Sequence, residues 1–218
     1  MPSNSILLVE GVNDAHVFFN LFDRHSISFD KPPMKGQPSV EGKFSVKPQD
    51  GIETLLKNLG VQIKASEREN IGIVVDADED PQSRWNALSN ILRKAGYKNI
   101  PSSAVSGGAI IHEEGLPSIG IWVMPDNSLL GMLEHFVASM VSGSDPLWIH
   151  AQNVVNNIQI SDRKFSNRHV MKAQIHTWLA WQEVPGIPMG AAIKATFLDA
   201  NTPLASQFIS WVKTLFNC

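Results

Sequence analysis

The chain contains a single cysteine among its 218 residues, Cys218, and this scarcity excludes several kinds of site. One cysteine cannot build an intramolecular disulfide framework, a thiolate zinc site or a cysteine redox pair. The chain also lacks a large excess of positive or negative charge. It has 18 basic and 21 acidic residues, which give a formal net charge of -3. The chain therefore has no broad basic surface for nucleic acid. Any such contact must come from a local basic patch or from metal ions held by acidic side chains.

Long apolar runs are missing as well. No segment approaches the ~18 consecutive apolar residues that a membrane helix requires. The segment 1–4 places no basic region before an apolar stretch, so it does not resemble a signal peptide. We expect a cytoplasmic protein with no membrane partner. The hydrophobic share of 43% is that of a globular protein, and the length suits one domain with an appended element.

The first two thirds of the chain alternate between apolar runs typical of buried strands and segments with helical spacing. This order predicts an α/β fold, with a mostly parallel sheet covered by helices on both faces. Residues 30–42 are rich in proline and glycine and are predicted to form a loop. The expected strands are 5–9, 44–48, 71–75 and 119–124, and the expected helices are 13–23, 52–59 (ended by Gly60), 81–95 (ended by Gly96) and 129–141.

The strand signal fades after about residue 145. Helices are expected at 147–158, 168–182 and 203–216, and the segment with Gly186, Pro188 and Gly190 is expected to be a loop between the last two. We therefore predict an α/β domain over residues 1–143 and a helical C-terminal extension over 144–218. The extension could be a helical subdomain or further helices on the same sheet.

Acidic residues follow three of the predicted strands. Glu10 ends the first strand, Asp76 and Asp78 follow the strand at 71–75, and Asp126 follows the strand at 119–124. The carboxyl ends of parallel strands meet at one edge of a sheet, where ligands bind. Carboxylates that lie close together need a cation between them, and Mg²⁺ (or Mn²⁺) prefers oxygen ligands. The pattern favours a divalent-metal site.

The acidic segment 76–80 also has features of other kinds of site. An EF-hand loop requires glycine at its sixth position and glutamate at its twelfth, where this chain has Pro81 and Ala87, so that interpretation fails. A haloacid-dehalogenase-like phosphatase usually has threonine or valine where this chain has Asp80. A sugar-nucleotide transferase motif has no other support. The segment could also be the solvated first turn of a helix that begins at Pro81.

Two motifs together resemble a known domain. Leu7-Leu-Val-Glu-Gly11 with Asp14, followed by Val74-Val-Asp-Ala-Asp78, resembles the Toprim domain of topoisomerases, bacterial primases and the OLD (overcoming lysogenization defect) nucleases. The first motif is closest to the OLD-like branch, and the resemblance covers about residues 5–140. Four further segments resemble a small, uncharacterised bacterial group within that superfamily: 124–127, 131–134, 176–182 and 188–192.

The resemblance implies a set of functional residues. Glu10 would act as general acid/base or metal ligand, Asp76 and Asp78 would hold Mg²⁺, and Asp14 and Glu134 would complete a second site. Two ions placed this way clamp the attacking and leaving oxygens of a phosphodiester. The strand-end pattern adds Asp126, either as a ligand or as the acceptor of its own Pro-Asp-Asn turn.

OLD nucleases also use a downstream lysine, for which Lys172 and Lys194 are the candidates. No P-loop sequence is present, and the only tyrosine, Tyr97, is more typical of packing than of a topoisomerase nucleophile. The basic run 161–172 could contact a phosphate backbone or form a solvated helix face. Trp178 and Trp181 are expected in the core or in the interface of a homodimer.

These observations predict a Mg²⁺-dependent, nuclease-like protein that cleaves phosphodiester bonds in DNA or RNA. Two alternatives stay open. One is a non-catalytic Toprim module that binds a nucleotide or a partner protein, and the other is a metal-dependent phosphohydrolase acting on small molecules.

Overall fold

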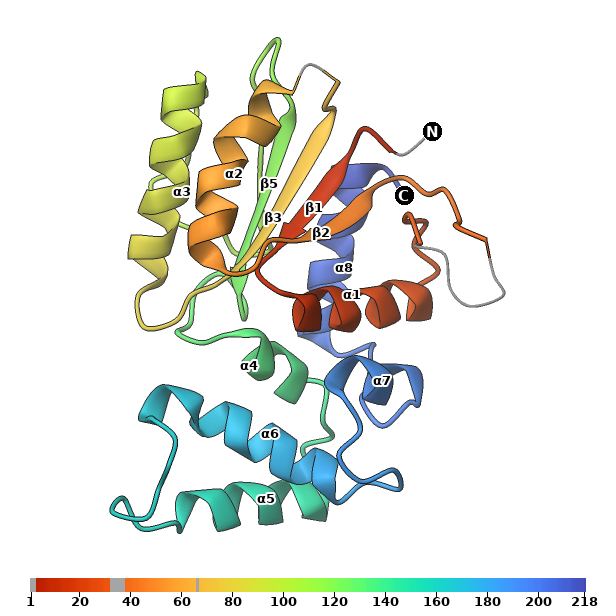
Figure 1. The fold of residues 1–218 in the computed structure, drawn as a ribbon, viewed down its shortest axis with the longest axis vertical. Coiled ribbons are helices and arrows are strands. Elements are labelled where there is room, and N and C mark those ends of the chain that lie inside the picture. The colour runs from red at the N-terminus through yellow and green to blue at the C-terminus, as the bar shows by residue number, and fades with distance from the viewer. Residues whose placement is uncertain (1–2, 32–37, 66) are drawn as a thin grey trace.

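A mixed sheet lies in the upper part of the molecule as drawn in Figure 1, with helices on both of its faces. The structure is a computed structural model and describes residues 3–31, 38–65 and 67–218. Within them the sheet has five strands in the order β2-β1-β3-β5-β4. The strands are β1 (Ile6–Val9), β2 (Ser45–Pro48), β3 (Asn70–Asp76), β4 (Ala109–Ile111) and β5 (Ser118–Met124). All neighbouring pairs are parallel except β4 with β5, which confirms the predicted α/β class.

Helices cover both faces of the sheet. The pleat of β1 sends Leu7 and Val9 to one face and Ile6 and Leu8 to the other, and all four are buried. The first face packs against α1 (Val12–Arg24) and α8 (Pro203–Phe216), and the second against α2 (Ile52–Lys64) and α3 (Pro81–Ala95). Strands buried on both faces read as unbroken apolar runs, which is why the sequence revealed them.

Helix α8 lies directly on the sheet because two glycines leave room for it. Gly72 and Gly120 are paired across β3 and β5. A Cβ atom added to Gly120 would lie 2.4 Å from Leu215 Cδ2 and 2.9 Å from Trp211 Cζ2. The last helix of the chain is therefore one of the further helices on the same sheet, in the core that it shares with β1, β3 and β5.

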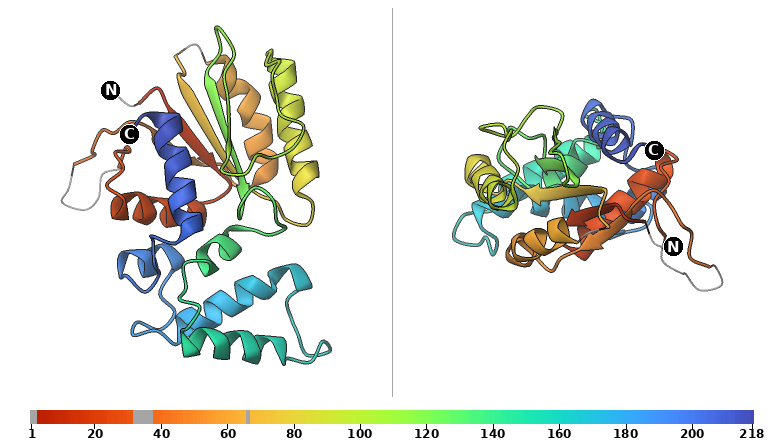
Figure 2. Two further views of the ribbon diagram at one scale, coloured as in Figure 1. Left: turned by 180° about the vertical axis from the view of Figure 1, so that it is seen from behind. Right: turned by 90° about the horizontal axis from the view of Figure 1, so that it is seen from above.

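The remaining helices form a layer beyond the carboxyl ends of the parallel strands (Figures 1 and 2). Helix α6 packs against both α4 and α5, and α7 packs against α1. The Trp178 side chain is buried and donates to Asp145 Oδ2 at 2.8 Å, while Trp181 is 37% exposed. The elements are α4 (Leu133–Ala138), α5 (Pro146–Asn156), the short 3-10 helix η1 (Asn167–His169), α6 (Val170–Ala180) and α7 (Met189–Lys194).

Three predicted boundaries are wrong, and glycine is involved in each. Gly60 does not end α2, which continues to Lys64 because Ile63 is buried against the sheet. The helix predicted at 129–141 begins only at Leu133, because the backbone of Gly131 pairs with Asp78. Gly190 lies inside α7 rather than in a loop, where a Cβ atom would meet the His16 carbonyl oxygen at 2.5 Å.

The structure confirms one further predicted helix end and adds a strand that was not predicted. Gly96 ends α3 with φ 110°, as predicted. The short strand β4 has no counterpart in the predicted elements. In the predicted loop at 30–42, Lys31 and Val40 form an antiparallel bridge, and residues 32–37 lie outside the described residues. Among the helices that the structure describes, none is long and apolar enough to cross a membrane.

The contact between α8 and the sheet can be tested by adding one methyl group. We expect Gly120→Ala to lower the free energy of unfolding by about 1–3 kcal/mol, because the rigid Trp211 ring restricts the repacking. Gly60→Ala is the matched control: nothing lies within 4 Å of its added Cβ, so it should raise the free energy of unfolding by roughly 0.5–1 kcal/mol. Urea unfolding measures both. Equal stabilities of the two variants would contradict this packing.

Candidate functional site

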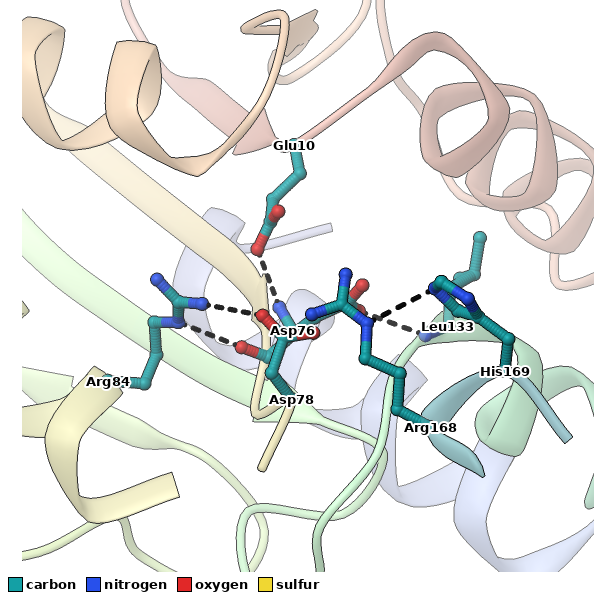
Figure 3. Close-up of polar contacts among 7 residues, drawn as sticks. All are labelled: Glu10, Asp76, Asp78, Arg84, Leu133, Arg168 and His169. Atoms are coloured by element: carbon teal, nitrogen blue, oxygen red, sulfur yellow. Dashed lines mark hydrogen bonds and ion pairs between the residues drawn. The ribbon is translucent and has the colours of Figure 1, made fainter. Parts of the chain in front are cut away.

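The first and third strands bring two acidic side chains together at the carboxyl edge of the sheet. Glu10 follows β1, and its Oε1 accepts a hydrogen bond from the Asp76 N–H at 2.8 Å. Asp76 ends β3, and its Oδ1 accepts from the Leu133 N–H at the start of α4 at 2.9 Å. Figure 3 shows this chain of contacts. The sheet edge predicted from the sequence therefore does gather these acids, and it fixes where α4 begins.

Asp14 and Glu134 complete a group of four acids, here called the acidic cluster together with Glu10 and Asp76. Burial raises the pKa of Asp76 well above its usual range, and the charges of Glu10, Asp14 and Glu134 add to the shift. Burial also raises the pKa of Asp14 to about 6, with contributions from Glu10 and Glu134. The pKa of Glu10 is raised mainly by burial. Asp14 and Asp76 are therefore each repelled by the negative charges of other acids in the cluster.

Glu134 has the least exposed side chain of the four acids and has a basic partner. The residue is only 5% exposed, so it is not a solvated helix acid. Its Oε1 lies 2.9 Å from Nζ of Lys172, which projects from the first turn of α6. Lys194, the other candidate lysine, ends α7 and makes no ion pair with these acids in the part of the chain that the structure describes.

Asp78 lies beside the acidic cluster but binds an arginine. Its Oδ2 accepts from Arg84 Nη2 at 2.9 Å, and Arg84 Nε donates to the Asp76 carbonyl oxygen at 2.9 Å. The backbone of Asp78 has φ 52°, in the left-handed region that aspartate tolerates better than most residues. Two hydrogen bonds with Gly131 hold it there, at 2.8 and 3.0 Å.

Two further acids serve local turns. Asp126 Oδ1 accepts from the N–H groups of Ser128 and Leu129 at 3.0 and 2.8 Å, which is the turn role considered for it. No hydrogen bond or ion pair joins it to the acidic cluster in the described ranges, and its role as a metal ligand stays a prediction. Asp80 caps α3 by accepting from the Ser83 N–H at 2.9 Å.

Arg84 is a site residue that was not predicted from the sequence, although the sequence contains a signal for it. Basic side chains are unfavourable near a helix N-terminus because they oppose the helix dipole. Arg84 lies in the first turns of α3, which indicates a specific acidic partner nearby. Arg168 belonged only to a basic run, and Figure 3 shows it extending from η1 toward Asp76 and Asp78. No local pattern could show that direction.

The donor set fits a hard divalent cation in its chemistry, because it consists of carboxylate oxygens. The side chains would have to move to receive one. No three Asp, Glu, His or Cys side chains within residues 3–31, 38–65 and 67–218 are already arranged to hold a metal ion. Two of the six predicted ligands are instead engaged by cations, Asp78 by Arg84 and Glu134 by Lys172.

Comparison with protein families finds one family model that matches almost the whole chain. A family model described as a protein of unknown function, DUF3226, matches residues 4–217. The chain belongs to the DUF3226 family. The match extends from β1 through α8, so this family unit includes both the strand-end acids and Lys172. No curated protein and no solved structure matches the chain.

The raised pKa of Asp14 makes stability depend on pH. Its pKa is about 6 in the folded protein against 3.8 for a free side chain, so the folded state binds the proton more tightly. The free energy of unfolding should therefore fall as the pH rises from about 4 to 6. Asp14→Asn removes this loss and should raise the free energy of unfolding at pH 7.5 by up to roughly 3 kcal/mol, with a much smaller effect at pH 4.

Urea unfolding at the two pH values measures this difference. The control is Asp162→Asn, which neutralises an exposed aspartate outside the acidic cluster and should leave the pH dependence unchanged. A gain for Asp14→Asn that is equal at both pH values would contradict the electrostatic explanation.

Proposed function

We propose that this DUF3226 protein cleaves phosphodiester bonds in DNA or RNA with the help of Mg²⁺ (or Mn²⁺). The observation that carries the proposal is the convergence of four carboxylates, from β1, α1, β3 and α4, beside the ammonium group of Lys172. Such a cluster costs stability, because burial and neighbouring negative charges raise the pKa values of Glu10, Asp14 and Asp76. Strongly shifted pKa values of this kind concentrate at functional sites.

The Toprim resemblance supports the same reaction. Its two motifs, residues 7–11 with Asp14 and residues 74–78, lie on the neighbouring parallel strands β1 and β3 and on α1. Glu10, Asp14 and Asp76 would hold the metal ions, with Glu134 available when it leaves Lys172 and Asp78 available when it leaves Arg84. Bound Mg²⁺ supplies a positive charge that polarises the phosphoryl oxygen and lowers the pKa of water.

The protein's own side chains have distinct roles in this proposal. The raised pKa of Glu10 suits a general acid/base, which works best when its pKa approaches the working pH. The Asp76 N–H orients the Glu10 carboxylate through their hydrogen bond. Lys172 stabilises the negative charge that develops on the phosphate, for which its half-exposed side chain is accessible.

A second candidate function is hydrolysis of a small phosphoester. It is favoured by the modest size of the cavity next to Asp78, about 250 Å³. A third, a module that binds without turnover, is favoured by the engagement of Asp78 and Glu134 with cations of the protein itself. The same assays separate all three.

The central test replaces two acids by their amides. Glu10→Gln and Asp76→Asn keep the oxygen that accepts the Asp76 or Leu133 N–H, so both variants should fold. We expect each to lower the rate of Mg²⁺- or Mn²⁺-dependent cleavage by about 100-fold or more. The measurements are turnover of plasmid DNA, RNA and a chromogenic phosphodiester, together with calorimetric titration of Mn²⁺.

Asp199→Asn is the matched control, because an amide oxygen still accepts from the Asn201 N–H, and it should change the rate less than about threefold. Unchanged cleavage in both acid variants would refute the proposal. Turnover of the small ester alone would establish the phosphohydrolase, and Mn²⁺ binding without any turnover would establish the binding module.

The role of Lys172 has its own test. We expect Lys172→Gln to lower kcat by roughly 10²-fold while KM changes little, because the ammonium group acts on charge that develops in the transition state. Lys172→Arg should restore part of the rate. Lys194→Gln is the control, because it also removes a lysine from the C-terminal helices. Steady-state kinetics of the two Lys172 variants and of Lys194→Gln provide the comparison. Equal effects of the two glutamine variants would assign no special role to Lys172.

A further inference from the structure

A cavity of about 250 Å³ lies beside the acidic cluster, between Asp78, the segment that leads into α4, and the start of α6. Asp78 belongs to the candidate metal site as well, so the cavity opens next to the place where a phosphate would bind. The lining residues that matter here are Asp78, Met132, His135, Arg168, Met171 and Gln174.

Gln174 supplies a buried polar group that lacks a full set of partners. The residue is only 5% exposed. Its Nε2 donates to Asn156 Oδ1 at 3.0 Å, which fixes the orientation of the amide. Its Oε1 accepts no hydrogen bond from the residues that the structure describes. This oxygen is not fully enclosed by the protein, so it is available to accept a hydrogen bond from a ligand in the cavity.

The other walls combine flexible apolar groups with one cation. Met132 and Met171 present thioether side chains, which adapt to flat rings and make favourable contacts with them. Arg168 Nε donates to His169 Nε2 at 3.2 Å, while its two terminal nitrogens make no hydrogen bond within the described ranges. Figure 3 shows this guanidinium directed toward Asp76 and Asp78. The cavity thus offers an apolar surface, a hydrogen-bond acceptor and a phosphate-binding cation.

We propose that the cavity binds a single unpaired nucleotide, with the base against Met132 and Met171, its edge donating to Gln174 Oε1, and its phosphate beside Arg168. The inference rests on the proposed function, since it places the phosphate next to the acidic cluster. The volume of about 250 Å³ is below the roughly 300–1,000 Å³ of sites that enclose drug-sized ligands, so the cavity would hold the base and leave the phosphate at its mouth. Reading a base in such a pocket requires that it leave the stack or come from a single strand.

Binding of one unpaired nucleotide in the cavity would restrict the substrate to nucleic acid that has an unpaired nucleotide at the reacting phosphate. A single strand and a frayed end are examples. A free mononucleotide has the same chemistry and is the other source of the ligand. Binding of the single strand and binding of the free mononucleotide can each be measured directly with Ca²⁺ as the only divalent cation, so that the measurement does not require cleavage.

The experiment titrates the full chain with adenosine and thymidine 5′-monophosphates, a short single-stranded oligonucleotide and its duplex, by calorimetry. We expect Arg168→Gln to weaken mononucleotide binding about tenfold, which corresponds to about 1.4 kcal/mol. Met171→Trp should abolish binding by filling the cavity. Lys164→Gln, which removes an exposed cation from the same basic segment but not from the cavity lining, should change affinity less than twofold.

Each outcome assigns the ligand or rejects it. Competition between the mononucleotide and the single strand, with the duplex weaker, supports a strand end as the source. Mononucleotide binding without any single-strand binding supports a free nucleotide. No mononucleotide binding by the unmodified protein, or equal effects of Arg168→Gln and Lys164→Gln, would overturn the inference. If phosphodiester cleavage persists in that case, only the pocket is refuted; if nucleotides bind and no cleavage occurs, only the proposed function is refuted.

Discussion

Repulsion among buried carboxylates is the constraint on which the rest of this structure depends. Glu10, Asp14, Asp76 and Glu134 come from four different parts of the chain, and burial disfavours the charged forms of Glu10, Asp14 and Asp76. The fold restrains them with directed contacts. The Asp76 N–H binds Glu10, the Leu133 N–H binds Asp76, and Lys172 neutralises Glu134. A protein under selection for stability alone would replace such groups, so their presence favours a functional role.

The C-terminal helices connect the stability of the fold to the composition of the site. Helix α8 closes one face of the sheet through the close approach that Gly72 and Gly120 permit. Between α4 and α8 the chain leaves the sheet to form α5, α6 and α7, and α6 carries Lys172 to the acids and contributes Met171 and Gln174 to the adjoining cavity. The same excursion therefore supplies both the counter-charge of the acidic cluster and a wall of the proposed nucleotide pocket.

Much of the fold was predictable because its signals are local. A strand buried on both faces is an apolar run whatever lies beside it, and α3 carries its own cap and stop in Asp80 and Gly96. The errors arose where a distant contact outweighed a local preference. Gly60 remained helical because the residues around it pack on the sheet, and the start of α4 was delayed because Gly131 pairs with Asp78. Local propensity contributes about 1 kcal/mol at such positions, which tertiary packing exceeds.

The sequence by itself determined that acids follow the strands at 5–9 and 71–75, and parallel strand order then required Glu10 and Asp76 to share one edge of the sheet. It could not determine which cations meet them. Arg84 and Lys172 were selected by the tertiary structure, because a long basic side chain can reach several partners and only the packing of α3 and α6 decides which one lies within 3 Å. Charge interactions act through space rather than along the chain. The acids could therefore be identified from the sequence, whereas the basic residues that pair with them could be identified only from the tertiary structure.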